Sequence, residues 1–178
     1  AYVAIYGAGP IGLASIMLCK ASGAAKVIAF EVSPQRRELA EKVGADYVFD
    51  PTEVVAHEKV LEVTESQGAD LHVEAAGAPP KVIPEMEQSL AINAKVVQIG
   101  RAAERVPMYL ETLQVRRGQL YGSQGHSGHA IFPNVIRMMA AGLIDMTPIV
   151  TARYDLDGVV EAIKQSRSRT DGKIIVRI

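Results

Sequence analysis

The sequence has 178 residues, of which 48% are hydrophobic and 22% charged, and its net charge at pH 7 is −1. This balance is ordinary for a globular chain and gives no electrostatic reason to expect nucleic acid or a membrane surface as a partner. The apolar runs are strand-sized, far below the roughly 20 residues that cross a bilayer.

The single cysteine, Cys19, rules out an intrachain disulfide and is expected to be a small buried hydrophobe in a helix. No signal peptide is visible, and together these features favour a cytoplasmic protein. The chain begins at Ala1, inside a strand pattern and without a methionine. We therefore expect a fragment whose upstream part is missing.

Short β-rich runs alternate with amphipathic stretches of helical length over the first hundred residues. Gly23, Gly44 and Gly68 fall where three of these helices are expected to stop. The alternation predicts right-handed crossovers and a doubly wound parallel sheet of about six strands, a three-layer α/β Rossmann fold. The expected strands are 2–6, 26–31, 47–49, 70–74 and 95–100, and the expected helices are 10–22, 34–43, 53–66 and 79–90.

The pattern loosens after Gly100, where a loop is expected at 101–111 and a glycine-rich stretch at 122–128. The last strand is expected to pair outside the parallel sheet. We divide the chain into a first domain at 1–125, whose ligand is predicted by the motif described next, and a C-terminal segment at 126–178 that completes it. Further strands are predicted at 119–122, 149–154 and 173–178, and helices at 132–143 and 157–167.

The strongest local signal runs from Gly7 to Gly12, where three glycines follow an apolar strand and open a helix. Gly7 permits a tight turn, Gly9 lets the backbone approach a pyrophosphate, and Gly12 lets the helix pack on the sheet. Pro10 suits the first helical turn, and the free amides there, including that of Ile11, would face the diphosphate.

Glu31 lies 19 residues after Gly12, close to the roughly 20 residues expected for an acid that binds the adenosine ribose. A 2′-phosphate there would meet like charge, at a cost of up to ~4 kcal/mol at an effective dielectric near 20, which favours NAD over NADP. Arg36 and Arg37 instead favour NADP, because arginine binds a 2′-phosphate. Both could also be solvated helix residues.

Several motifs together resemble the zinc-type medium-chain dehydrogenase/reductase family, and they span nearly the whole chain. They are GAGPIGL at 7–13, Glu31, VGAD at 43–46, EAAG at 74–77, VVQIG at 96–100 and GKIIV at 172–176. Within that family, the stretches 114–129 and 132–150 are similar to inositol and polyol dehydrogenases.

The resemblance implies an NAD-dependent alcohol–ketone redox reaction in which zinc polarises the substrate oxygen. The family's zinc ligands come from an N-terminal catalytic domain that these residues do not contain, so we expect no catalytic or metal-binding residue here. The family's strand at 119–122 often lies at a dimer seam, which implies a homo-oligomer. The implied cofactor contacts are Gly7, Gly9, Pro10, Ile11 and Gly12 at the pyrophosphate, Glu31 and Arg36 at the adenosine ribose, Ala75 and Gly77 in the cleft, Ile99, Gly100 and Arg101 at the nicotinamide carboxamide, and Ser123 near the nicotinamide.

Three other functions remain open from the sequence. An FAD-binding domain shares the glycine loop and the acid, although the fifth strand ends in Ile99-Gly100-Arg101 without the acid that usually holds a flavin chain. An S-adenosylmethionine-binding domain more often has the loop G-x-G-x-G. A third possibility is a module that binds NAD(H) without turnover.

Four polar candidates are weaker. His126 and His129 lie in the glycine-rich stretch, where a surface loop is favoured over a metal site, although His126 could project toward the nicotinamide. Glu74 is expected to cap the turn before Gly77 rather than to touch a cofactor. Lys173 could approach the pyrophosphate in an assembled enzyme.

Overall fold

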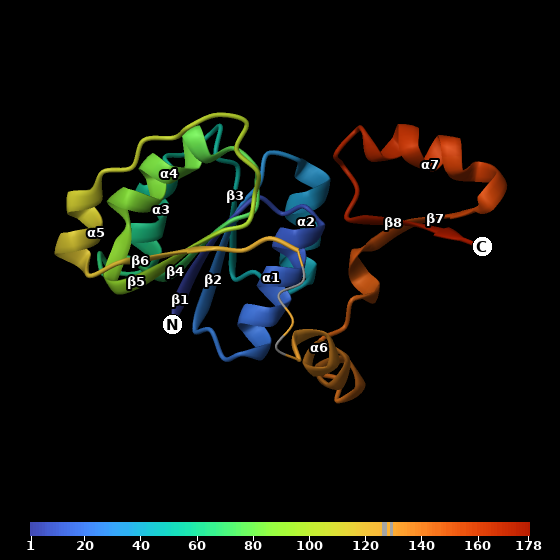
Figure 1. Ribbon diagram of the computed structural model, residues 1–178, viewed down its shortest axis with the longest axis horizontal. Coiled ribbons are helices and arrows are strands. Elements are labelled where there is room, and N and C mark those ends of the chain that lie inside the picture. Colours follow the sequence, from blue (N-terminus) through green and yellow to red (C-terminus); the bar gives the residue numbers. More distant parts are fainter. Residues whose placement is uncertain (126–127, 129) are drawn as a thin grey trace.

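The computed structural model describes residues 1–125, 128 and 130–178, and its main feature is a six-stranded parallel sheet (Figure 1). The strand order is β3-β2-β1-β4-β5-β6, and every neighbouring pair is parallel. The predicted doubly wound α/β fold is therefore confirmed. The bounds of this part are β1 (Tyr2–Tyr6), α1 (Pro10–Ala21), β2 (Lys26–Phe30), α2 (Pro34–Lys42), β3 (Tyr47–Phe49), α3 (Ala56–Val63), β4 (Ala69–Glu74), α4 (Pro79–Gln88), β5 (Leu90–Gln98), α5 (Leu110–Arg116), β6 (Gln119–Gly122) and α6 (Ile131–Ala140).

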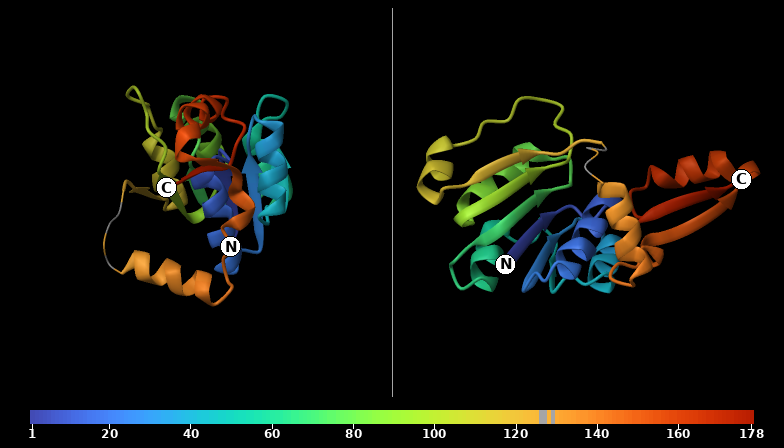
Figure 2. Two further views of the ribbon diagram at one scale, coloured as in Figure 1. Left: turned by 90° about the vertical axis from the view of Figure 1, so that its right-hand side faces the viewer. Right: turned by 60° about the horizontal axis from the view of Figure 1, so that its bottom comes forward.

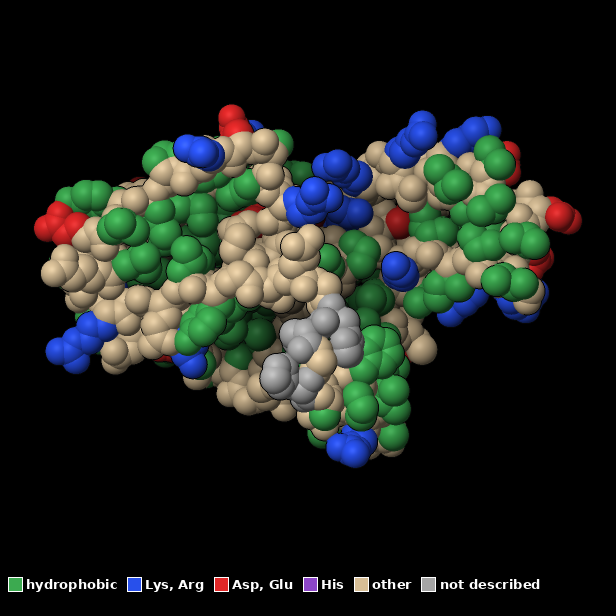
Figure 3. Space-filling view, in the orientation of Figure 1, with side chains coloured by type: hydrophobic (Ala, Val, Ile, Leu, Met, Phe, Trp, Pro, Cys, Tyr) green, Lys and Arg blue, Asp and Glu red, His purple; other side chains and the backbone are tan. Residues whose placement is uncertain are grey.

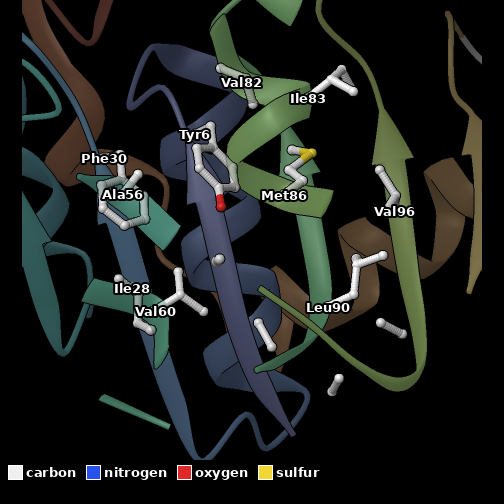
Figure 4. Close-up of a cluster of buried hydrophobic side chains, with 14 of the residues drawn as sticks. Tyr6, Ile28, Phe30, Ala56, Val60, Val82, Ile83, Met86, Leu90 and Val96 are labelled. Atoms are coloured by element: carbon white, nitrogen blue, oxygen red, sulfur yellow. The ribbon is translucent and has the colours of Figure 1, made fainter. Parts of the chain in front are cut away.

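The sheet is buried on both faces because successive side chains of a strand point to opposite sides. In β1, Ala4 and Tyr6 join a core beneath α3 and α4, whereas Val3 and Ile5 join a second core beneath α1 and α2. Figure 4 shows the first core, in which Tyr6 stacks on Phe30 with ring centroids 5.1 Å apart. Two cores around one sheet give the three layers.

The order of the strands creates a crevice at one edge of the sheet. After β1 the chain builds outward through β2 and β3, and then crosses back to place β4 on the other side of β1. The turns that follow β1 and β4 therefore diverge at the carboxyl ends of their strands. Ligands of open α/β sheets bind at this switch point.

Several elements differ from their predicted bounds. Helix α5 occupies Leu110–Arg116, where the sequence suggested only the end of a loop. Strand β5 begins at Leu90 rather than at residue 95, and a register shift in its pairing with β4 accommodates the extra residues. Helix α3 begins three residues later than expected, since the preceding residues form turns.

The C-terminal part forms a second, two-stranded parallel sheet that projects beside α2 (Figures 1 and 2). As expected, the last strand pairs outside the main sheet. Its elements are η1 (Thr147–Ile149), β7 (Val150–Asp155), η2 (Leu156–Gly158), α7 (Val159–Ser166) and β8 (Lys173–Arg177).

Large apolar side chains remain exposed in three regions: Figure 3 shows hydrophobic side chains gathered over α5 and β6 and again over α7, β7 and β8, and a third group lies on α6, at Ile131, Phe132, Ile136 and Met139. The first group contains Tyr109, Leu110, Val115, Leu120 and Tyr121, and the second contains Leu156, Val160, Ile163, Ile175 and Ile178. Among the described residues, no helix combines the length and the apolar character that crossing a membrane requires.

Candidate functional site

The turn between β1 and α1 packs tightly at two of its three glycines. Gly7 has φ +92°, and a Cβ there would lie 2.6 Å from the Ala76 Cα atom. A Cβ at Gly12 would overlap the Gly7 carbonyl oxygen. These two positions therefore require glycine for the fold itself, because φ is positive at the first and there is no space at the second.

Gly9 differs, because its surroundings are open. A Cβ at Gly9 would meet only the Arg36 Nη1 atom, at 3.7 Å, and φ is an ordinary −67°. Pro10 is the first residue of α1, and no side chain caps the helix start. The amides of Gly9, Ile11 and Gly12 have no acceptor among the described residues. Open space, free N–H groups and the positive end of a helix dipole together suit an anion.

Glu31 directly follows β2, beside this loop, and is only 6% exposed. Its Oε2 atom accepts a hydrogen bond from the Ala8 amide at 2.6 Å, and its Oε1 atom accepts one from the Ser33 amide at 2.9 Å. The carboxylate thus joins the glycine loop to the end of β2. Each oxygen retains a second lone pair that can accept a hydroxyl proton.

A cleft of about 580 Å³ opens beside Glu31 and Gly9 at the carboxyl ends of β1 and β2. Its walls are mostly apolar, which suits a flat, weakly polar group such as a nucleotide base. The apolar walls include Tyr6, Phe30, Val32, Pro51, Val54, Val55, Ala78 and Val82, and the charged residues in the lining are Glu31, Arg36, Lys81, Glu85 and Arg169.

Two arginines meet at the mouth of this cleft. Arg36, on α2, donates from Nε to the Asp171 carbonyl oxygen at 2.9 Å, which draws the C-terminal segment over the cleft. Partial burial lowers the pKa of Arg36; the nearby carboxylate of Glu31 opposes this effect and the charge of Arg169 adds to it. The Arg169 guanidinium has no hydrogen-bond or carboxylate partner among the described residues. Paired guanidinium groups at an open cleft attract phosphate.

A second hollow, of about 490 Å³, lies at the carboxyl ends of β5 and β6. It is lined by residues 98–102 and 122–124, and the Ser123 amide ties its two sides by donating to the Gln98 carbonyl oxygen at 2.9 Å. Two of its residues, Gly100 and Gly122, have no side chain, so backbone groups form part of this lining. Such groups are suited to recognising a carboxamide.

The predicted contact residues fall into four groups. Gly7, Gly9, Glu31, Arg36 and Ala75 line the first cleft, and Ile99, Gly100, Arg101 and Ser123 line the second hollow. Pro10, Ile11 and Gly12 form the start of α1, and Gly77 packs against Arg101. The structure thus gathers all of them at one edge of the sheet, and their contacts with a nucleotide remain predictions.

Sequence reasoning missed part of the cleft lining. Arg169 is separated from the glycine loop by some 160 positions and follows no motif, so only the folded chain brings it to the cleft. Lys81 and Val82 come from the first turns of α4. The position of α4 after a strand at the switch point was the available signal. Arg37, in contrast, binds Asp50 at 2.7 Å and does not line the cleft.

The histidines divide into two kinds. His72 is fully buried, with Nε2 at 3.1 Å from the Ser89 carbonyl oxygen, and burial lowers its pKa to about 4. His57 pairs with Glu85 at 2.9 Å. Both have structural contacts within the protein. His126 and His129 lie outside the described residues.

Other candidates can be placed more briefly. No group of three or more His, Cys, Asp or Glu side chains that could hold a metal is found in the described part of the chain. Lys173 begins β8 and is exposed, and it lines neither hollow. Cys19 is only half-buried, and burial raises the pKa of its thiol.

Fold and site together define a Rossmann-type domain with a glycine-rich loop at its switch point. The chain matches the zinc-binding dehydrogenase family over residues 10–141. It is 45% identical over 177 residues to scyllo-inosose 3-dehydrogenase from Thermotoga maritima, an alignment that covers 97% of this chain and 44% of that protein. The chain therefore belongs to the zinc-binding dehydrogenase family.

Further relatives agree with this assignment. L-threonine 3-dehydrogenase from Pyrococcus horikoshii is 35% identical over 97% of this chain and 50% of that protein. Among solved structures, an alcohol dehydrogenase from Thermotoga maritima superposes with a TM-score of 0.93 at 43% identity, covering 99% of this chain and 46% of that one. The chain spans about half the length of these relatives. The family match does not favour the FAD or S-adenosylmethionine alternatives.

Proposed function

We propose that this chain is the NAD(H)-binding domain of a zinc-dependent alcohol or polyol dehydrogenase, which transfers a hydride between nicotinamide and a secondary alcohol or ketone. Residues 1–125 bind the dinucleotide, and residues 126–178 complete the domain and return toward a catalytic domain. The observation that carries the proposal is the open, unpaired helix start at Gly9, with the Glu31 carboxylate one strand away.

The two ends of the cofactor bind in different places, the adenosine in the first cleft and the nicotinamide in the second hollow. The apolar cleft takes the adenine, and Glu31 accepts hydrogen bonds from the ribose hydroxyls, with Arg36 beside it. The amides of Ile11 and Gly12 donate to the diphosphate, which crosses the switch point. The nicotinamide then lies at the second hollow, where backbone groups of residues 99–101 hold its carboxamide. When bound, the nicotinamide accepts or donates the hydride.

The remaining parts of the proposal concern the whole enzyme. Zinc ligands and most substrate contacts come from a catalytic domain other than these residues. The similarity to scyllo-inosose 3-dehydrogenase favours a polyol or cyclitol as the substrate. Strand β6 is the edge of the main sheet, and all four of its residues are exposed. An exposed edge strand can pair with a second copy of the chain, which favours a homo-oligomer. The whole enzyme is placed in the cytoplasm.

Calorimetric titration with four ligands tests this proposal. NADH should bind saturably, and NADPH should bind more weakly because its 2′-phosphate meets Glu31. FAD and S-adenosylmethionine should not compete with NADH. Tighter binding of either of these two ligands, or equal affinity for NADH and NADPH, would contradict the assignment of the cofactor.

A further inference from the structure

Glu74, the last residue of β4, is a carboxylate that is fully buried at the switch point. Its Oε1 atom accepts hydrogen bonds from the amides of Ala76 and Ala78, at 3.1 and 3.2 Å. Its Oε2 atom accepts one from the Gln98 side-chain amide at 2.8 Å. A buried carboxylate is tolerated only where donors replace its water, and these three do so without an ion pair among the described residues.

The Gln98 side chain connects the Glu74 carboxylate to the turn that follows β5. Its Nε2 atom also donates to the Gly100 carbonyl oxygen, at 2.6 Å. The backbone reinforces the link, because the amides of Ile99 and Gly100 donate to the Glu74 carbonyl oxygen at 3.0 and 2.9 Å. Residues 98–100 are therefore fixed to the end of β4 by both side chains and main chain.

The turn is packed so closely that residue 100 has no space for a side chain. A Cβ at Gly100 would overlap the Glu74 Oε2 atom and would lie 2.5 Å from the Gly77 amide nitrogen. Glu74 lines neither hollow. Its carboxylate therefore contacts the buried side of the turns and would not contact a bound ligand. A change at Glu74 would therefore reach the second hollow only through the turn that forms its wall.

We infer that Glu74, acting through Gln98, is a positioning residue that holds the turn at residues 99–101 in the geometry required by the nicotinamide end of the cofactor. This inference rests on the proposed NAD(H) function. It assigns a role to a buried acid that the bound cofactor would not touch.

Glu74→Gln keeps the hydrogen bonds of one carboxylate oxygen and disrupts the hydrogen bond of the other. The new amide oxygen still accepts from Ala76 and Ala78, whereas the new NH₂ group faces the NH₂ group of Gln98. Gln98 can then pair with the substituted side chain only by flipping its own amide, which breaks its bond to Gly100. Gln98→Met removes the same link from the other side. Gln88→Met serves as the control, because Gln88 is exposed and bonds only its own helix, at Pro84.

The experiment compares NADH with ADP-ribose, which shares the adenosine and diphosphate but lacks the nicotinamide. Both variants should bind NADH about ten-fold more weakly, the equivalent of one lost hydrogen bond, and ADP-ribose within about two-fold of the wild type. The fluorescence of bound NADH should also change, because the nicotinamide then meets a displaced wall. Gln88→Met should match the wild type in every titration.

The outcomes separate the two proposals. Equal losses for NADH and ADP-ribose would show a general structural role and would overturn the inference, as would unchanged NADH binding. Wild-type protein that binds neither ligand would overturn the proposed function and the inference together. Should Glu74→Gln not fold, Gln98→Met still tests the inference, because Gln98 is only partly buried and unchanged NADH binding or equal losses for both ligands would overturn it. Gln98 also lines the second hollow, so the Glu74→Gln result takes precedence wherever that variant folds.

Discussion

Single residues in the glycine loop have separable tasks, and the structure shows which of them serve the fold. Gly7 and Gly12 are packed against backbone atoms of neighbouring turns, so a larger residue at either would disturb the native state directly. Gly9 has no such neighbour, and its backbone is in an extended region that any residue adopts. Neither packing nor backbone conformation requires glycine at position 9, so we predict that a side chain there would interfere with a ligand rather than with the fold.

Gly9→Val tests this distinction. The valine side chain fills the space in front of the α1 amides, so NADH affinity should fall at least about ten-fold. The free energy of unfolding should change by no more than about 1 kcal/mol, since the site is open and the backbone unstrained. Calorimetry and urea unfolding measure the two quantities.

Gly12→Ala provides the contrast for that experiment. Its Cβ would overlap the Gly7 carbonyl oxygen, so this variant should lose stability even without ligand. Unchanged NADH affinity in Gly9→Val, or a stability loss like that of Gly12→Ala, would argue against an open anion site at Gly9.

His72 predicts how stability depends on pH. Burial lowers its folded-state pKa from 6.5 to about 4, so between these values the unfolded chain binds a proton that the folded chain excludes. Stability should therefore be unaffected by this group above pH 6.5 and should fall as the pH drops toward 4, by about 3 kcal/mol in total. Urea unfolding of the wild type and of His72→Asn across this range measures the effect. A wild-type slope no steeper than that of the variant would contradict it.

At the scale of elements, short apolar runs predicted most of the strands, because a parallel sheet is buried on both faces and its strands are apolar along their whole length. Strand β6 was placed at its observed bounds. Helix α5 was missed because it has only seven residues and buries none of them, so it has no hydrophobic periodicity to detect. The early start of β5 was missed because Leu90 and Ala91 could equally well end the preceding helix.

In the candidate site, the residues that lie close together in the sequence could be predicted, and those brought in from distant parts of the chain could not. The places of Gly7, Gly9 and Glu31 at the cleft could be predicted because, in folds of this kind, a phosphate loop and a ribose-binding acid lie at fixed spacings within one strand–helix–strand unit. Their contacts with a cofactor stay a prediction. Arg169 could not, since its place at the cleft depends on how the segment between α7 and β8 folds back over α2. Glu31's bond to the Ala8 amide likewise required the loop's actual path.

Arg169→Ala tests the contribution of this C-terminal segment. Removing an exposed cation from the cleft mouth should weaken NADH about three- to ten-fold at low salt, and the loss should shrink as salt screens the interaction. Arg167→Ala is the matched control, because Arg167 is exposed on the same segment but does not line the cleft. Equal effects of the two substitutions, or a loss independent of salt, would show that Arg169 does not face a phosphate.

At the scale of the whole molecule, one edge of one sheet gathers all the features that the proposal uses. The glycine loop, Glu31, the turn after Glu74 and the second hollow all follow carboxyl ends of parallel strands. The exposed apolar groups on α5 with β6 and on α7, β7 and β8 line neither hollow, although the exposed Val32 and Val55 do line the cleft. We therefore expect ligand binding in the hollows to leave both groups open to contact with further protein.

Backbone NMR during an NADH titration tests the central claim most directly, because it reports both whether the dinucleotide binds and where. We predict saturable shifts of the amide resonances of Gly9, Ile11 and Gly12, and of residues 99–101, all following one dissociation constant. Resonances of α5 and of residues exposed on α7 should remain unchanged. No saturable shift, or shifts that leave the start of α1 untouched, would contradict the account.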